Sequence, residues 1–482
     1  MHFDFNALLD LAIECSPGAR QVIDCKKKEG GFNRVFMIHL DNGKTVVARL
    51  PTRVAGPPRL TVSSEVATLQ FVKERTNIPV PSVLSWSSET DNAIGCEYIV
   101  MNAMPGVPLK DVWNIMTTSQ HIRCIQAMSR LNVQLWRLDF PCYGSLYLSS
   151  KSPHDAVSLD DTYMIPWDLE STHGSLTTSG AYKRNTGHSL EAYLLALLAK
   201  ARSIAPGKRS ENQGDQLLYS EEARTALLDT VQDSLKPIIG LDAVQNASGP
   251  TLFHPDFHTR NIFVDSEDPT KITGIIDWQS AAIEPSFMLT AETPDFAEEL
   301  PHDGSAHEES STETDELTPQ AKVRVDAEFC AKSWAVMLHI CPKSRAAHDL
   351  DSSLVHLLAA GSAGWLKDAV SMRQILLEVG AKWEELQLPG ESFYKPGDTE
   401  AAELKRQFDV MKTDRQLRDH LARLVGCQTD GWVPVERWDE VLPVYRKEYR
   451  RFVESFLNEA HTDEEKAAAV REANSLWPFD QR

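Results

Sequence analysis

The sequence predicts an α+β fold, in which a small β-rich N-terminal region, residues 1–102, precedes a larger and mainly helical region, residues 103–482. Two short apolar segments near the N-terminus flank an Asn-Gly turn, which is a strong short-range signal of a β-hairpin. Beyond residue 103, apolar residues recur at the three- and four-residue spacing of helices. A sheet region followed by a helical region indicates the α+β class.

The β-rich region begins with the predicted hairpin. Segments 31–40 and 45–50 alternate apolar and polar residues around the Asn-Gly turn at 42–43. One helix is predicted over 61–76, because its apolar residues recur at helical spacing and a Pro-rich segment follows. Residues 97–101, EYIVM, read as another apolar strand. We therefore expect a small sheet with one helix packed on it.

The helical region has one interruption that we expect to be irregular. Residues 291–320 hold ten acidic residues and no Lys or Arg, which predicts a solvated, mobile insertion. Helical periodicity is predicted elsewhere in seven stretches, namely 121–138, 190–203, 220–235, 322–341, 353–380, 400–425 and 440–472.

The amino-acid composition disfavours several kinds of partner and location for this protein. The formal net charge of -20 disfavours partners such as nucleic acid and anionic membrane surfaces. The eight cysteines are scattered without a CxxC pair, so we expect reduced thiols in an intracellular, cytoplasmic protein. No apolar run approaches the roughly 18 residues of a membrane span. The acidic N-terminal segment is also unlike a cleaved transit peptide.

The segment TLFHPDFHTRNIFVD, residues 251–265, carries the clearest chemistry. Asp256 is followed five residues later by Asn261, and Asp277 lies across a second predicted hairpin. We expect these three polar groups to converge at one edge of that hairpin. Transfer of a phosphoryl group from Mg-ATP requires such a set, with one group that accepts the hydroxyl proton and two oxygen ligands for magnesium.

These residues carry a resemblance to a known family. HPDFHTRN, residues 254–261, resembles the HxDxxxxN catalytic loop of the aminoglycoside phosphotransferase and choline kinase families, and IIDW, residues 275–278, is similar to their metal-binding segment. Segments GFNRVFMI, VVARLP, SSEVATLQFV and CEYIVM most resemble the fungal group around altered inheritance of mitochondria protein nine. The resemblance implies a protein-kinase-like bilobal fold with ATP between the two lobes.

The resemblance also implies the roles of the motif residues. Asp256 would be the catalytic base, and Asn261 and Asp277 would bind magnesium. His254 would support the loop by packing and hydrogen bonding. By their residue types alone, His258 and Arg260 could contact phosphate or substrate, or could equally serve as loop hydrogen-bond donors.

The nucleotide site would draw on the β-rich region. Arg49 stands where kinases of this shape place the strand lysine that grips the phosphates, and Glu65 matches its ion-pair partner. The glycine turn Gly30-Gly31 would let backbone N–H groups approach phosphate. Main-chain groups near Met101 and Ala103 would hydrogen-bond the purine.

We therefore expect an ATP- and magnesium-dependent phosphotransferase that acts on a hydroxyl of a small molecule. Protein kinases carry Asp-Phe-Gly where this chain has Asp277-Trp278-Gln279, which argues for a small-molecule acceptor. The acceptor itself stays open between a cationic amine, an amino sugar, a sugar and another metabolite. Two alternatives also stay open, namely a nucleotide-binding regulatory pseudokinase and a protein kinase. The sequence indicates no oligomeric state.

Overall fold

The structure of the chain is a computed structural model that describes residues 2–29, 32–52, 57–149, 156–166, 189–203, 221–298, 319–360, 369–427, 431, 433, 437–458 and 461–479. The chain forms two compact units. The first comprises residues 1–209, 221–368 and 375–393, and the second comprises 210–220, 369–374 and 394–482. The predicted boundary at residue 102 coincides with the end of a strand, but both sides of it belong to the first unit.

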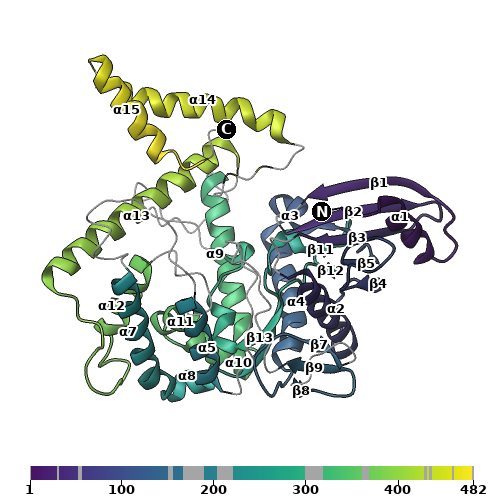
Figure 1. The fold of residues 1–482 in the computed structure, drawn as a ribbon, viewed down its shortest axis with the longest axis horizontal. Coiled ribbons are helices and arrows are strands. Elements are labelled where there is room, and N and C mark those ends of the chain that lie inside the picture. Colours follow the sequence, from purple (N-terminus) through teal and green to yellow (C-terminus); the bar gives the residue numbers. More distant parts are fainter. Residues whose placement is uncertain are drawn as a thin grey trace. The chain divides into compact units, whose positions relative to one another are not determined.

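A five-stranded antiparallel sheet forms the β-rich region (Figure 1). Its order is β1-β2-β3-β5-β4. The strands are β1 (Val22–Glu29), β2 (Asn33–Leu40), β3 (Thr45–Pro51), β4 (Val83–Ser87) and β5 (Tyr98–Asn102). The predicted hairpin is β2–β3, and its turn uses Gly43 at a φ of 78°. The sheet and the helices that follow it confirm the α+β class.

Helices cover both faces of this sheet, whereas the sequence predicted a single helix packed on it. Strand residues alternate between the faces, so neighbours such as Ile99 and Val100 pack into different clusters. The predicted helix is α2 (Pro58–Arg75), which packs through Val62 and Val66 on one face. The other face is covered by α1 (Phe5–Glu14), which the sequence reading missed although Asp4 caps it.

A connector leads from β5 to a small sheet that carries the candidate site. This sheet has the order β12-β11-β6, with β6 (Val107–Pro108), β11 (Ile262–Val264) and β12 (Ile272–Ile275). Gly106 has a φ of 89°, and a Cβ there would lie 2.0 Å from the carbonyl oxygen of Val264. The connector can approach β11 this closely only because residue 106 is glycine.

Helices and short strands make up the rest of the first unit. The helices are α3 (Leu109–Val112), α4 (Thr118–Trp136), α5 (Leu190–Ser203), α7 (Glu221–Ile239), α8 (Asp242–Asn246), α9 (Pro319–Leu338), α10 (Pro342–Asp349) and α11 (Ser352–Ala360), while α12 (Ala369–Ala381) extends across both units. The 3-10 turns are η2 (Trp113–Ile115), η4 (Thr259–Asn261), η5 (Ser286–Thr290) and η6 (Asp295–Ala297). The short strands are β7 (Tyr147–Leu148), β8 (Ala156–Ser158), β9 (Tyr163–Pro166), β10 (Pro250–Phe253) and β13 (Ala282–Pro285).

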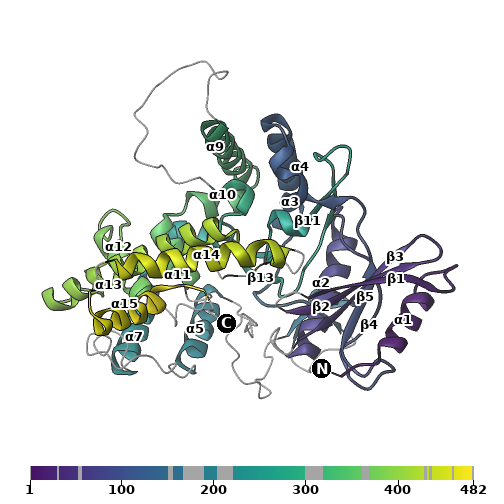
Figure 2. The same ribbon diagram turned by 90° about the horizontal axis from the view of Figure 1, so that it is seen from above.

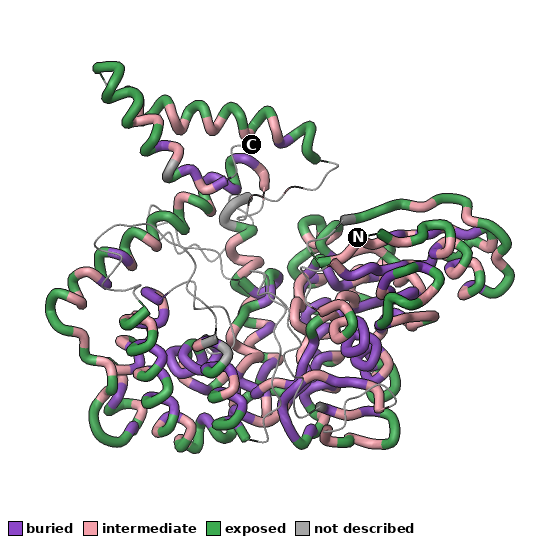
Figure 3. Tube along the Cα trace, in the orientation of Figure 1, coloured by how far each residue is buried: buried purple, intermediate pink, exposed green. Residues whose placement is uncertain are grey.

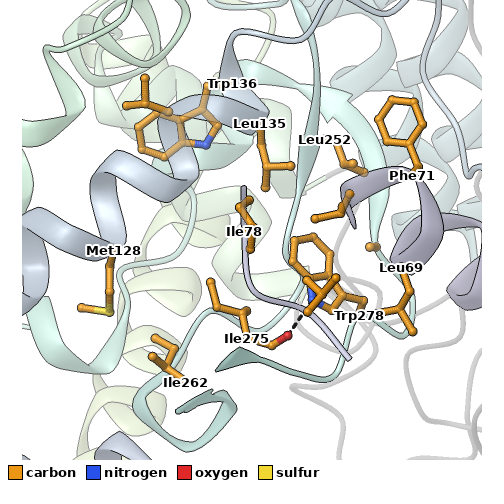
Figure 4. Close-up of a cluster of buried hydrophobic side chains, with 14 of the residues drawn as sticks. Leu69, Phe71, Ile78, Met128, Leu135, Trp136, Leu252, Ile262, Ile275 and Trp278 are labelled. Carbon is orange, nitrogen blue, oxygen red and sulfur yellow. Dashed lines mark hydrogen bonds between the residues drawn. The ribbon is translucent and has the colours of Figure 1, made fainter. Parts of the chain in front are cut away.

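The main core connects the helical part of this unit with the small sheet. Figure 4 shows Trp278 among the side chains of this core, with its indole Nε1 donating to the carbonyl oxygen of Ile275 at 3.0 Å. Met128 and Leu135 of α4 and Ile262 of β11 belong to the same cluster. Ile262 and Val264 of β11 and Ile275 of β12 are themselves buried, and the buried parts of the chain are purple in Figure 3.

The acidic segment begins with ordered structure. Residues 295–297 form η6 and bury Phe296 and Ala297, although they lie inside the stretch expected to be solvated. Residues 299–318 lie outside the described residues, and α9 begins at Pro319.

The second unit contains α13 (Asp398–Val425), α14 (Trp438–Leu457) and α15 (Asp463–Leu476). Its core includes Leu421 of α13 and Trp477, whose indole Nε1 donates to the Tyr445 hydroxyl at 3.1 Å. The stretch 440–472, predicted as helical throughout, is interrupted before α15. Thr462 caps this helix by accepting a hydrogen bond from the N–H of Glu465.

Candidate active site

Strand pairing brings the three predicted site residues to one place. Ile262 of β11 pairs with Ile275 of β12, so the residues that flank this pair, Asn261 and Ile276, are neighbours at the same end of the hairpin. The N–H of Ile276 donates to the carbonyl oxygen of Asn261 at 2.9 Å. Asp277 therefore lies next to the loop that holds Asp256.

Asn261 and Asp256 are joined directly. The amide nitrogen of Asn261 donates to the carbonyl oxygen of Asp256 at 2.9 Å and to its carboxylate oxygen Oδ2 at 2.7 Å. These two hydrogen bonds fix the orientation of the carboxamide. Because the nitrogen faces Asp256, the oxygen Oδ1 of Asn261 is the atom that this side chain offers to a ligand.

The buried ring of His254 supports the loop that contains Asp256. The N–H of Asp256 donates to its Nδ1 at 3.1 Å, so that nitrogen is an acceptor, and Nε2 carries the hydrogen that goes to the carbonyl oxygen of Ile276 at 2.8 Å. The ring also packs edge-on against Trp278. Burial lowers the pKa of His254, so the ring is neutral at pH 7. It connects the loop of Asp256 with the segment of Asp277.

Two basic side chains contact the Asp256 carboxylate. Arg260 donates through Nη2 to Oδ1 at 2.5 Å and through Nε to Oδ2 at 3.2 Å. His258 places its Nε2 3.5 Å from the same Oδ1. In this state the guanidinium balances the charge of the carboxylate, and an acceptor hydroxyl would have to approach beside Arg260.

Asp295 is a site residue that the sequence analysis missed. Its carboxylate accepts hydrogen bonds from the N–H of Thr259 at 3.0 Å and from the Thr259 hydroxyl at 2.6 Å. Its own N–H donates to Nδ1 of His258 at 3.0 Å. Burial acts to raise the pKa of Asp295, but nearby His258 and the hydrogen bonds from Thr259 outweigh it, so this pKa is lowered. The only signal in the sequence was an aspartate inside the acidic stretch, which gave no reason to place it here.

Arg49 connects the β-rich region with Asp277. Its Nη1 forms an ion pair with Glu65 of α2, and its Nη2 lies 2.8 Å from Oδ1 of Asp277. The same Nη2 donates to Oε1 of Gln279 at 3.0 Å, a contact that the sequence analysis also missed. Asp277 has a φ of 67°, which a residue other than glycine rarely adopts outside functional sites.

The Arg49–Glu65 pair is buried, and burial opposes both of its charges. Burial raises the pKa of Glu65 to about 7, with Asp277 acting in the same direction and Arg49 against it. Burial also opposes the charge of Arg49, but the carboxylates of Glu65 and Asp277 raise the pKa of its guanidinium, which stays charged. Arg49 is therefore a fixed positive charge in the β-rich region.

Some of the backbone groups predicted to contact the purine already form hydrogen bonds within the protein. The N–H of Ala103 donates to the carbonyl oxygen of Thr45 at 3.1 Å, and the carbonyl oxygen of Ala103 accepts from the side chain of Asn102 at 3.1 Å. Met101 lies inside β5, paired with strands on both sides. The glycine turn 30–31 lies outside the described residues.

A cavity of about 730 Å³ adjoins the loop. Its polar end includes Asp256, His258 and Asp277, and its wall is formed largely by apolar and aromatic side chains of the helical part. Members of that wall include Leu135, Trp136, Tyr193, Leu197, Met288, Leu289 and Trp334, with Glu284 and Glu292 as acidic members. A small molecule in this cavity would lie against the Asp256 carboxylate.

Comparisons with known proteins identify the family of the chain. The profile of the phosphotransferase enzyme family matches residues 28–286, which is more than half of the chain and includes every predicted site residue. The chain belongs to this family.

The curated proteins similar to this chain include two from fungi. A subtelomeric hrmA-associated cluster protein of Aspergillus fumigatus is 31% identical over 297 residues, covering 55% of this chain and 58% of that protein. Altered inheritance of mitochondria protein 9 of Yarrowia lipolytica is 25% identical over 296 residues, covering 56% of this chain and 50% of that protein. The aligned part of the chain thus spans little more than half the length of these relatives.

Solved structures of antibiotic phosphotransferases are also similar. The ternary complex of APH(2")-IIa with streptomycin and ATP has a TM-score of 0.41 at 13% identity, and 78% of this chain and 97% of that chain are covered. Within the described parts of the chain, none of the helices combines the length and the apolar character that a membrane span requires.

Proposed function

We propose that the protein is an ATP-dependent phosphotransferase that transfers the γ-phosphoryl group to a hydroxyl of a small molecule. The observation that carries this proposal is that Asp256 and Asp277 line one cavity, while Asn261 donates to Asp256 and Arg49 pairs with Asp277. A structural role for Asp256 alone would account for neither Asn261 nor Asp277.

Asp256 is the proposed catalytic base. It lines the cavity, so its carboxylate can accept the proton of a bound hydroxyl as the oxygen attacks phosphorus. Arg260 donates to both oxygens of this carboxylate and orients it. General base catalysis of this kind contributes about 10² to 10⁴-fold in rate.

Asn261 and Asp277 are the proposed magnesium ligands. The carboxamide oxygen of Asn261 and the carboxylate of Asp277 are hard oxygen donors of the type that magnesium prefers. Asp277 engages Arg49 through Oδ1, so its Oδ2 is the atom proposed for the metal. When bound there, magnesium would supply positive charge against the phosphates. Arg49 would then contact the phosphates, and Glu65 would hold it in position.

The remaining nucleotide contacts are proposals with different support. Gly30 and Gly31 would approach the phosphates through backbone N–H groups. Met101 would border the purine, but Ala103 would have to give up its hydrogen bond to Thr45 to contribute its N–H. His254 is proposed to act only by positioning the loop.

The acceptor is proposed to combine a hydroxyl with an apolar body. Apolar and aromatic side chains together make up much of the cavity wall, which favours a molecule that buries apolar surface. Glu284 and Glu292 would tolerate an amino group on it. A relative named as a clavilactone A biosynthesis cluster protein, 25% identical over 266 residues, is in keeping with a small-molecule acceptor.

A nucleotide-binding regulatory pseudokinase is the second candidate. The observation that favours it is that both functional carboxylates already have arginine partners, Asp256 with Arg260 and Asp277 with Arg49. A protein kinase is a weaker candidate, because Gln279 replaces the glycine of Asp-Phe-Gly. The mitochondrial names of some relatives make a mitochondrial location an alternative to the cytoplasm.

The test is Mg-ATP consumption by the purified protein against a pooled panel of amines, amino sugars, sugars and apolar alcohols. We expect acceptor-dependent release of ADP that falls at least 10²-fold in Asp256→Asn, while nucleotide binding is retained. Asp233→Asn, on an exposed position of α7, is the matched control and should keep full turnover. Equal turnover of Asp256→Asn and the control would refute the role of Asp256, and nucleotide binding without turnover on any acceptor would favour the pseudokinase.

A further inference from the structure

A second group of chemically reactive side chains lies between α4 and α9. These two helices run side by side (Figures 1 and 2). His121 belongs to α4, and Asp326 and Cys330 lie one helical turn apart on α9. Nδ1 of His121, a carboxylate oxygen of Asp326 and Sγ of Cys330 all lie within 4.8 Å of one another.

The hydrogen bonds around His121 leave one nitrogen without a suitable partner. Its Nε2 lies 2.8 Å from the carbonyl oxygen of Trp113, which can only accept, so Nε2 carries a hydrogen. Nδ1 of His121 and Oδ1 of Asp326 are buried, and within the described residues neither has a hydrogen-bond partner. Nδ1 does approach Oδ2 of Asp326 at 2.6 Å, but not in the geometry of a hydrogen bond.

Buried polar atoms without partners are rare in folded proteins and require an explanation. A cation placed among the three side chains would engage the lone pair of Nδ1 and the carboxylate at the same time. A histidine that binds a metal through one nitrogen usually donates its other N–H to a carbonyl or carboxylate. The hydrogen bond from His121 to Trp113 has this form.

We propose that His121, Asp326 and Cys330 bind one zinc ion. Imidazole, carboxylate and thiolate are all established zinc ligands, and the thiolate disfavours magnesium and calcium. Zinc–ligand distances of about 2.0 to 2.3 Å place tetrahedral donors roughly 3.3 to 3.8 Å apart, so the donors need only small side-chain rotations. Water would complete the fourth position.

Binding requires the thiolate form of Cys330. The apolar surroundings raise the pKa of Cys330 to about 12, so without zinc the side chain is a neutral thiol. Formation of the Zn–S bond displaces the thiol proton to solvent, and no electron is transferred. Zinc would take Nδ1 of His121 through its lone pair and Asp326 as its carboxylate, and any proton shared between these two groups would also pass to solvent.

The position of this cluster suggests a structural role near the candidate active site. Trp113 stacks on His121 at a centroid distance of 4.0 Å. On α9, Trp334 stacks on Phe257, the residue next to Asp256. Zinc would fasten α9 to α4 and thereby hold the helix that packs against the loop of Asp256.

The experiment measures zinc in the full-length, tag-free protein. After removal of metal by a chelator and dialysis, the protein is titrated with ZnCl₂, with zinc content and thermal unfolding as readouts. We expect about one zinc per chain and a rise in the unfolding midpoint on the order of 5 °C. Cys330→Ser keeps the size of the side chain and should lose both effects, and Asp326→Asn should weaken zinc binding at least tenfold.

Cys142→Ser is the matched control. Cys142 is as deeply buried as Cys330, and its pKa is shifted by burial alone, without a nearby charged group. This variant should bind zinc as the unchanged chain does. No zinc uptake by the unchanged chain, or equal uptake by Cys330→Ser and Cys142→Ser, would overturn the proposal. Neither readout depends on phosphotransferase activity.

Discussion

Asp295 offers the sharpest test of how the loop around Asp256 is held. Its carboxylate accepts two hydrogen bonds from Thr259, at 3.0 Å from the N–H and 2.6 Å from the hydroxyl. Thr259 is only 8% exposed. In Asp295→Ala, both donors lose their acceptor, and each such loss costs about 1 to 3 kcal/mol. Since the Asp295 side chain is 37% exposed, water replaces part of the lost hydrogen bonding, and we expect a total loss of stability near 2 kcal/mol.

The assay is hydrogen exchange of the backbone amides in the loop, combined with urea unfolding. A local loss of about 2 kcal/mol corresponds to roughly 30-fold faster exchange at the Thr259 amide. The effect should be largest at residues 256–261, because Thr259 begins the η4 turn that ends at Asn261. Asp295→Asn keeps one acceptor oxygen and should fall between the unchanged chain and Asp295→Ala.

Asp160→Ala is the control for a general loss of stability. Asp160 also accepts backbone hydrogen bonds, from Thr162 at 2.7 Å and Tyr163 at 2.9 Å, but it lies in the turn before β9. We expect it to lower the urea midpoint without changing exchange in the loop. If Asp295→Ala leaves exchange at Thr259 within twofold of the unchanged chain, or if Asp160→Ala accelerates it equally, the assignment of Asp295 as the support of this loop is wrong.

Two further predictions concern positions that shape the site. Burial lowers the pKa of His254, so below a pH of about 6.5 the unfolded chain binds more protons at this residue than the folded chain does. The stability of the protein should therefore fall as the pH drops from about 6.5 to about 5. The urea midpoint of His254→Gln should vary less with pH than that of the unchanged chain. Gly106 and Gly43 both have positive φ, but a Cβ meets the Val264 oxygen at 2.0 Å only at Gly106. We expect Gly43→Ala to cost about 1 kcal/mol of unfolding free energy and Gly106→Ala at least about 3 kcal/mol, and similar urea midpoints for the two variants would contradict the close approach.

Short-range patterns were sufficient for most of the fold. The turn at Gly43 predicted β2–β3, and helical spacing predicted α2, α4 and α5 close to their observed bounds. The helix α1 was missed because a short N-terminal segment gives little periodicity, although Asp4 before it is a capping residue. The break before α15 was missed although Thr462 and Glu465 form a capping box, because apolar spacing was weighed above the cap.

The candidate site was predictable where its residues are close in sequence. Asp256 and Asn261 share one loop, and the hairpin between Asn261 and Asp277 sets their proximity through local pairing. Asp295 and Gln279 could not be assigned contacts in this way, since their partners Thr259 and Arg49 lie 36 and 230 residues away. No periodic pattern specifies such pairs, because they depend on how the chain packs after its elements have formed.

The arginine at position 49 was the main departure from the expected kinase pattern, and the geometry gives a physical reason for it. The two terminal nitrogens of Arg49 point to different partners, Nη1 to Glu65 and Nη2 to Asp277. A lysine ammonium is a single point charge, whereas the planar guanidinium can donate to two groups in fixed directions. If magnesium takes over Asp277, the Nη2 side of the guanidinium becomes the donor for a phosphate oxygen while Nη1 stays with Glu65. Under the proposed function, the same residue would stabilise the site before nucleotide binds and contact the nucleotide afterwards, which lysine could do only by leaving one carboxylate.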